Sequence, residues 1–90
     1  MINWYYKTKI KESKIHGKGR FSAEKINKNS PVLSINGNIY KNENNSFVNH
    51  SLQNNIDINK ETNTWYANKN IEINEEITMN YLQWIKELPF

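Results

Sequence analysis

The sequence predicts a mainly β protein made of one small domain, and three observations support this prediction. Short runs rich in β-branched and aromatic residues recur along the chain, turns rich in glycine and asparagine separate them, and only the C-terminal tail shows helical spacing of apolar residues. Ninety residues allow one small domain and no more, because so short a chain removes only a modest share of its surface from water on folding. We therefore expect a thin core built mainly from the twelve isoleucines and eleven aromatic residues.

The first half of the chain is expected to be extended, with turns between its strands. Gly17 and Gly19 bracket a corner at which the backbone can take a positive φ angle. Asn36-Gly37 is typical of a two-residue hairpin turn. The strands predicted around these turns cover residues 4–11, 21–25, 31–35 and 38–40.

The second half is expected to be more polar and to end in a helix. Residues 41–63 are dominated by Asn, Glu, Lys and Thr, and we expect them to form mostly ordered loop. Two further strands are predicted over residues 64–67 and 77–81, with a tight turn over residues 71–76 between them. Apolar side chains at positions 81, 82, 85 and 88 suit about two helical turns, which Pro89 would end.

The composition excludes several kinds of site. Cysteine is absent, which excludes disulfides and thiolate metal ligands. His16 and His50 are the only histidines, and because a metal bound to this pair would lack a third ligand, we expect no metal site. The sequence shows neither a secretory leader nor a run of about eighteen apolar residues. We therefore expect no membrane partner and a cytoplasmic location, or a nuclear or host-cell location if the source is eukaryotic or viral.

The net charge of +3 comes from eleven lysines and one arginine against eight glutamates and one aspartate. Lysines cluster at positions 7, 9, 11 and 14, where strand alternation puts the first three on one face. This pattern favours a solvated strand edge, and the small net charge does not indicate a nucleic-acid partner. A basic β domain that binds nucleic acid through this edge is the weakest alternative. The small size and the many aromatic residues leave a homodimer open.

Four segments, in chain order, carry recognisable motifs. They run over Ser13–Ala23 with Gly17-Lys18-Gly19, over Ile26–Leu33, over Phe47–Ser51 with Asn49-His50-Ser51 followed by Asn55, and over Ala67–Tyr81 with Glu75-Glu76-Ile77-Thr78-Met79-Asn80-Tyr81. Together they resemble the motifs of the SET domain family of protein lysine methyltransferases. The fourth segment is the most specific match, and the order of all four across most of the chain strengthens the resemblance.

The resemblance implies that residues 1–90 form a single minimal SET domain. Its fold would be a β-clip of several short sheets with a knot-like C-terminal segment and a short C-terminal helix. Its activity would be the transfer of a methyl group from S-adenosylmethionine to the side-chain amine of an exposed lysine in a protein substrate. Tyr81 would be the catalytic residue, and the cofactor would be bound by Gly17, Lys18, Gly19, Asn49, His50, Tyr81 and Trp84. Tyr66 and Tyr40 are candidates for the walls of the lysine channel.

The sequence also departs from the family pattern. Leu52 and Asn54 stand where Cys and Pro are common, Asn74 replaces a turn glycine, and Asn80 replaces Asp. Only about eight residues join Tyr40 to the Asn-His-Ser segment, so the variable insert that normally forms one wall of the substrate groove is essentially absent, as is a cysteine-rich tail. The alternative function is therefore a catalytically inactive SET-like binding module that retains the fold and, in one version, the cofactor pocket.

Overall fold

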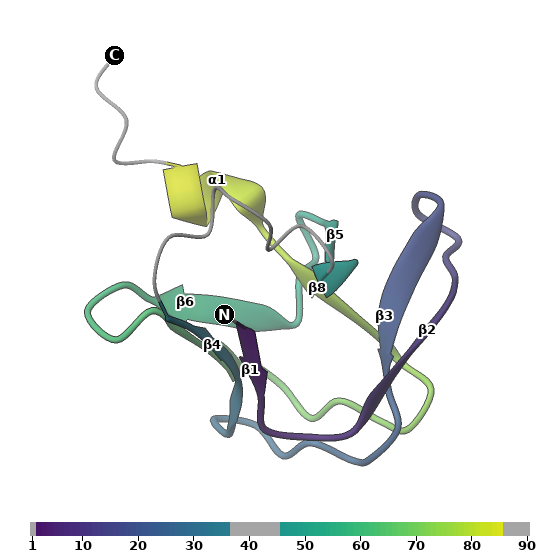
Figure 1. Ribbon diagram of the computed structural model, residues 1–90, viewed down its shortest axis with the longest axis horizontal. Helices are drawn as coiled ribbons and strands as arrows, with labels where there is room; N and C mark the ends of the chain where they lie inside the picture. Colours follow the sequence, from purple (N-terminus) through teal and green to yellow (C-terminus); the bar gives the residue numbers. More distant parts are fainter. Residues whose placement is uncertain (1, 37–45, 86–90) are drawn as a thin grey trace.

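The computed structural model describes residues 2–36 and 46–85, with side chains as far as Gln83 (Figure 1). Its elements are β1 (Ile2–Trp4), β2 (Thr8–Glu12), β3 (Lys18–Ser22), β4 (Pro31–Ile35), β5 (Asn49–His50), β6 (Ile56–Asn59), β7 (Thr64–Ala67), β8 (Glu76–Met79) and α1 (Tyr81–Ile85). This composition confirms the predicted mainly β fold with a short C-terminal helix. Within the described ranges, no helix has the length and apolar character needed to cross a membrane.

The strands form one curled sheet in the order β1-β4-β7-β6-β8-β3-β2, with β5 paired to β8 outside this path. Neighbours along the path are antiparallel except β6 and β8, and β5 also runs parallel to β8. Strand β8 therefore joins the half of the sheet that contains β6 to the half that contains β3. Its C-terminal end leads directly into α1, as Figure 1 shows.

The two ends of the strand order are brought together by a short connection. Only Tyr5, Tyr6 and Lys7 separate β1 from β2, although these strands lie at opposite ends of the path. The guanidinium of Arg20 in β3 lies 4.5 Å from the ring centroid of Trp4 in β1. This contact joins β1, at one end of the path, to β3, the neighbour of β2 at the other end.

The core is rich in isoleucine, as predicted, and its buried apolar side chains come from β4, β6, β7 and β8 and from the segments around Ile26, Val48 and Ile71. Trp65 is its largest fully buried side chain, and the other large apolar groups with less than 2% exposure are Ile26, Leu33, Ile56, Ile71, Ile77 and Val32. Full burial of one such aliphatic side chain contributes about 1.5–3 kcal/mol. Aromatic rings supply less of the core than expected, since Trp4 and Tyr6 are only partly buried against it.

The predicted strand over residues 4–11 is wrong, because the chain bends between Trp4 and Thr8 and forms two strands with different partners. Tyr5 N donates to the carbonyl of Val32, whereas Lys7 N donates to the carboxylate of Glu24. The strand predicted over residues 21–25 begins earlier, at Lys18, and ends at Ser22. At this end of the strand the Ser22 hydroxyl donates a hydrogen bond to the Glu24 carbonyl, two residues further along the chain.

The prediction of a loop over residues 41–63 is wrong in part, because this range contains β5 and β6. Both strands pair with β8, a partner far along the chain that local composition does not reveal. The strands over 31–35 and 64–67 are confirmed, and the turn over 71–76 is confirmed with Asn74 at φ 73°. Strand β8 covers residues 76–79 in place of 77–81. The predicted strand over 38–40 and the predicted helix end at Pro89 lie outside the described residues.

Helix α1 is attached to the sheet through Asp57 of β6. Gln83 Nε2 donates to Asp57 Oδ1 at 2.8 Å, and the amides of Asn54 and Asn68 donate to the same carboxylate at 2.8 and 3.0 Å. Burial alone raises the pKa of the Asp57 carboxyl, but the three amide hydrogen bonds outweigh burial and hold this pKa below its ordinary value.

A test of β8 anchoring uses Asn55, which is 2% exposed. Its Nδ2 donates to the Glu76 carbonyl at 2.8 Å, and its Oδ1 accepts from Thr78 N at 2.9 Å. Asn55→Ala should lower the free energy of unfolding by about 2–4 kcal/mol, because the buried Thr78 N–H and the part-buried Glu76 carbonyl lose their partner. Urea denaturation measures this, with Asn27→Ala on the exposed surface as a control expected to change stability by less than about 0.5 kcal/mol. Equal effects of the two substitutions would contradict the anchoring role.

A second test concerns the pH dependence of the α1 attachment. Because the pKa of Asp57 is lowered in the folded state, its carboxylate stabilises the fold above the ordinary pKa, and this contribution is lost as the pH falls through the folded value. Asp57→Asn should therefore be less stable than wild type at neutral pH, and the difference should shrink below about pH 4. Urea titrations at stepped pH measure this, with the exposed Glu61→Gln as control. A difference for Asp57→Asn that stays constant down to about pH 3 would argue against this account.

Candidate functional site

The side chain of Asn49 joins β5 to the glycine corner that precedes β3. This side chain is 9% exposed, and its Nδ2 lies 3.1 Å from the His16 carbonyl, 3.2 Å from the Lys18 carbonyl and 2.9 Å from Glu76 Oε2. An amide nitrogen carries two hydrogens, so one of them is shared between two acceptors. Segments that lie about thirty residues apart in the sequence thus meet at one nitrogen atom.

Glu76, at the start of β8, also accepts a hydrogen bond from Ser13. The Ser13 hydroxyl lies 2.8 and 2.9 Å from its two carboxylate oxygens. Gly19 packs directly on this carboxylate, and an added Cβ at Gly19 would lie 2.8 Å from Glu76 Cδ and closer still to Oε2. A side chain at position 19 would therefore displace the Glu76 carboxylate from its hydrogen bonds to Ser13 and Asn49.

At Gly17 the backbone conformation, and not close packing, favours glycine. Its φ angle is +46°, a conformation that residues with a Cβ rarely adopt, and an added Cβ would meet no atom within 4 Å. The backbone at this corner therefore borders open space.

Tyr81, the first residue of α1, is held at three points. Its backbone N–H donates to His50 Nδ1 at 3.0 Å, its ring centroid lies 5.0 Å from that of His50, and its hydroxyl donates to the Val48 carbonyl at 2.6 Å. Burial raises the pKa of the Tyr81 phenol above its ordinary value, so the hydroxyl remains protonated at neutral pH.

These contacts surround an open hollow of about 320 Å³. Its lining comprises His16, Gly17, Lys18, Ser46, Phe47, Val48, Asn49 and Tyr81. The structure therefore brings together four of the predicted site residues. Gly19 and His50 are not among the lining residues; they contact Glu76 and Tyr81 respectively, and the side chain of Trp84 lies outside the described part of the chain.

The wall formed by Ser46, Phe47 and Val48 was not predicted. Phe47 is 40% exposed and adopts φ 55°, which is uncommon for an aromatic residue. Val48 contributes through its carbonyl oxygen, which side-chain identity does not reveal. Tyr66, a candidate channel wall, lies in β7 opposite Asp57 and does not line this hollow, while Tyr40 lies outside the described residues.

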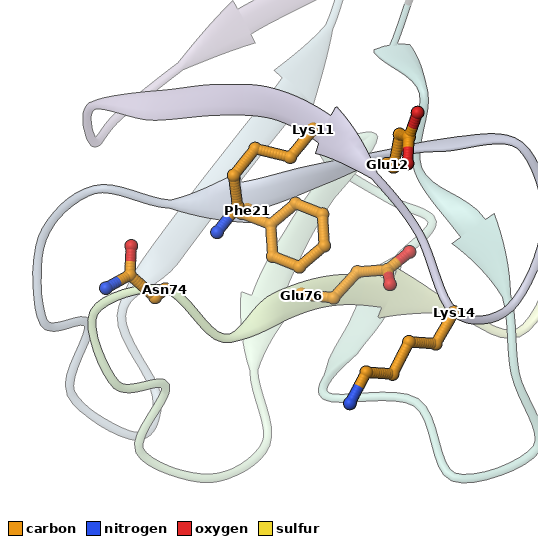
Figure 2. Close-up of a pocket in the computed structure, with 6 residues that line it drawn as sticks. All are labelled: Lys11, Glu12, Lys14, Phe21, Asn74 and Glu76. Carbon is orange, nitrogen blue, oxygen red and sulfur yellow. The ribbon is translucent and has the colours of Figure 1, made fainter.

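A second hollow of about 590 Å³ lies beside the β2–β3 hairpin (Figure 2). Its lining comprises Lys11, Glu12, Lys14, Phe21, Asn74 and Glu76, with Lys11 Nζ 4.4 Å from the Phe21 ring centroid. Glu76 faces this second hollow and bonds to Asn49, which faces the first one. The Glu76–Asn49 pair therefore separates the two hollows.

The two histidines lie near the first hollow without forming a metal site. His16 lines it, and His50 Nδ1 already accepts the Tyr81 N–H. Among residues 2–36 and 46–85, no group of three or more His, Cys, Asp or Glu side chains is arranged to hold a metal ion.

Comparison with known proteins extends the resemblance drawn from the motifs. The chain matches the model of the SET domain over residues 3–82. Its fold is similar to the crystal structure of a Plasmodium falciparum protein described as a "putative histone methyltransferase", with a TM-score of 0.57 and 26% identity over 84% of this chain and 93% of that one. No curated protein matches the chain. The motif-based resemblance is thus confirmed.

The close approach at Gly19 can be tested by a double-mutant cycle. Gly19→Ala should cost about 1–3 kcal/mol, because the new methyl overlaps the Glu76 carboxylate. Adding Glu76→Ala removes the overlap. In urea denaturation, the stability loss of the double mutant should therefore be smaller than the sum of the two single-mutant losses by about 0.5–3 kcal/mol. The control cycle pairs Gly17→Ala with Glu76→Ala and should be additive, since nothing lies near a Cβ at Gly17. Additivity in both cycles would refute the proposed contact.

Proposed function

The chain belongs to the SET domain family, and from this we propose that it is a protein lysine N-methyltransferase that uses S-adenosylmethionine. One observation supports the proposal most directly: the glycine corner, Asn49 and Tyr81 line the same hollow. The similar Plasmodium falciparum structure, described as a "putative histone methyltransferase", supports the same class of reaction. The substrate we propose is a protein that presents an exposed lysine.

The lining of the hollow fits such a cofactor. Its volume of about 320 Å³ lies at the low end of the range of about 300–1,000 Å³ that is typical of small-molecule sites. Gly17 lets a ligand approach the backbone, because the position of its missing Cβ is open. Lys18 offers an ammonium group for the carboxylate of the amino-acid part, and Phe47 offers an apolar surface for the nucleoside part. Asn49 holds the corner in place through the carbonyls of His16 and Lys18.

Methyl transfer to an amine is an in-line displacement, so the protein has to align two reactants and receive the lysine without its proton. S-adenosylmethionine supplies a methyl group attached to a positively charged sulfur. With an ordinary pKa of about 10.4, a lysine at pH 7 is neutral about once in a few thousand molecules, which corresponds to about 4.6 kcal/mol. Removal from water and a nearby positive charge both lower the pKa of the substrate lysine, so a strong general base is not required.

Tyr81 would orient the incoming amine. Its hydroxyl hydrogen is committed to the Val48 carbonyl, which leaves the oxygen lone pairs available to an N–H of the substrate. Because burial raises the pKa of this phenol, Tyr81 acts as a neutral hydrogen-bonding group. The anchor at His50 Nδ1 fixes the backbone from which the ring projects.

The proposal is tested with labelled S-adenosylmethionine and a library of lysine-containing peptides, which should yield methyl-lysine. Tyr81→Phe should lower kcat by about 10²-fold, because an orienting group at the reacting nitrogen is lost. The dissociation constant of the cofactor, measured by calorimetry, should rise by no more than about tenfold, because the lost hydroxyl also holds the Val48 carbonyl in the wall of the hollow. Tyr66→Phe in β7 is the matched control, and its kcat should be unchanged within about twofold.

The same measurements separate the proposal from its alternative. Cofactor binding by the wild-type protein without transfer to any peptide would instead favour the inactive SET-like binding module. Absence of cofactor binding would reject both the methyltransferase and a module that retains the cofactor pocket.

A further inference from the structure

Arg20 connects three parts of the structure at the closure of the curl. Its Nε donates to the Ser46 carbonyl at 2.9 Å, and its Nη1 donates to Thr8 Oγ1 at 3.0 Å. Its guanidinium lies 4.5 Å from the ring centroid of Trp4. Arg20 lies in β3, the strand that follows the glycine corner, and is half-buried. The side chain is therefore held in one direction by contacts on several sides.

The segment that Arg20 contacts forms a wall of the first hollow. Ser46, Phe47 and Val48 all line it, and the Val48 carbonyl receives the Tyr81 hydroxyl. Phe47 holds a positive φ angle of 55°, a backbone conformation that persists only where surrounding contacts impose it. The bond from Arg20 to the Ser46 carbonyl is such a contact, one residue before the strained position.

We propose that Arg20 is a positioning residue that holds the Ser46–Val48 wall in the shape the cofactor requires, and through Val48 sets the place of the Tyr81 hydroxyl. This inference rests on the proposed function. The planar guanidinium suits the role, since its nitrogens donate in fixed, diverging directions that reach Ser46 and Thr8 at once. A lysine keeps the positive charge beside Trp4 but offers one flexible ammonium, so it cannot maintain both bonds with the same geometry.

The matched comparison uses Arg20→Lys and Thr8→Val. Arg20→Lys disturbs the bond to the wall, whereas Thr8→Val removes the bond from Arg20 Nη1 to Thr8 Oγ1 and leaves the bond to Ser46 in place. Calorimetry with S-adenosylmethionine should show about tenfold weaker binding for Arg20→Lys and less than about twofold change for Thr8→Val. Thermal denaturation reports the stability loss of each variant separately. In the free protein, the backbone amides of residues 47–49 should exchange hydrogen faster in Arg20→Lys than in Thr8→Val.

The outcomes are distinguishable. Weaker cofactor binding and faster amide exchange in Arg20→Lys alone support the inference. Unchanged binding by Arg20→Lys, or an equal loss in Thr8→Val, overturns it while the proposed function stands. If the wild-type protein binds no S-adenosylmethionine, the proposed function and this inference fail together. Arg20→Gln serves the same comparison if Arg20→Lys does not fold.

Discussion

The hydrogen bond between Asn49 Nδ2 and Glu76 Oε2, 2.9 Å long, is the interaction on which the site depends. Hydrogen bonds to a carboxylate are stronger than bonds between neutral groups, and this carboxylate also accepts from the Ser13 hydroxyl. The amide of Asn49 meanwhile holds two carbonyls of the glycine corner. One polar pair therefore ties the hairpin, β5 and β8 together, and Gly19 is the residue whose small size lets these groups meet.

Strand β8 connects this cluster to the rest of the sheet. It pairs in antiparallel with β3 and in parallel with β6 and β5, so strands from both halves of the sheet pair with β8. Buried Asn55 binds the β8 backbone at two points. Tyr81 begins α1 two residues beyond the end of β8, and groups carried at the end of a rigid strand can be placed accurately. The position of its hydroxyl thus follows from sheet pairing.

The segment Ser46–Val48 links the hollow to the closure of the curled sheet, because it lines the hollow and accepts a hydrogen bond from Arg20. The wall of the hollow is held by Arg20 from the hairpin side and by the Tyr81 hydroxyl from the helix side. A site whose groups are positioned before the ligand arrives loses less conformational freedom on binding. In this way the described residues build the candidate site from backbone carbonyls, one amide and one phenol.

Local sequence patterns were enough to predict the elements with strong local signals and the residues that bear recognisable chemistry. The strands at 31–35 and 64–67 were predicted with correct bounds, and Gly17, Lys18, Asn49 and Tyr81 do meet at one hollow. The bend at Tyr5–Lys7, the strands within residues 49–59 and the contributions of Glu76 and Val48 became apparent only from the folded structure. The physical reason is that strand pairing and backbone carbonyl contacts depend on partners distant in the chain, which local side-chain patterns do not encode.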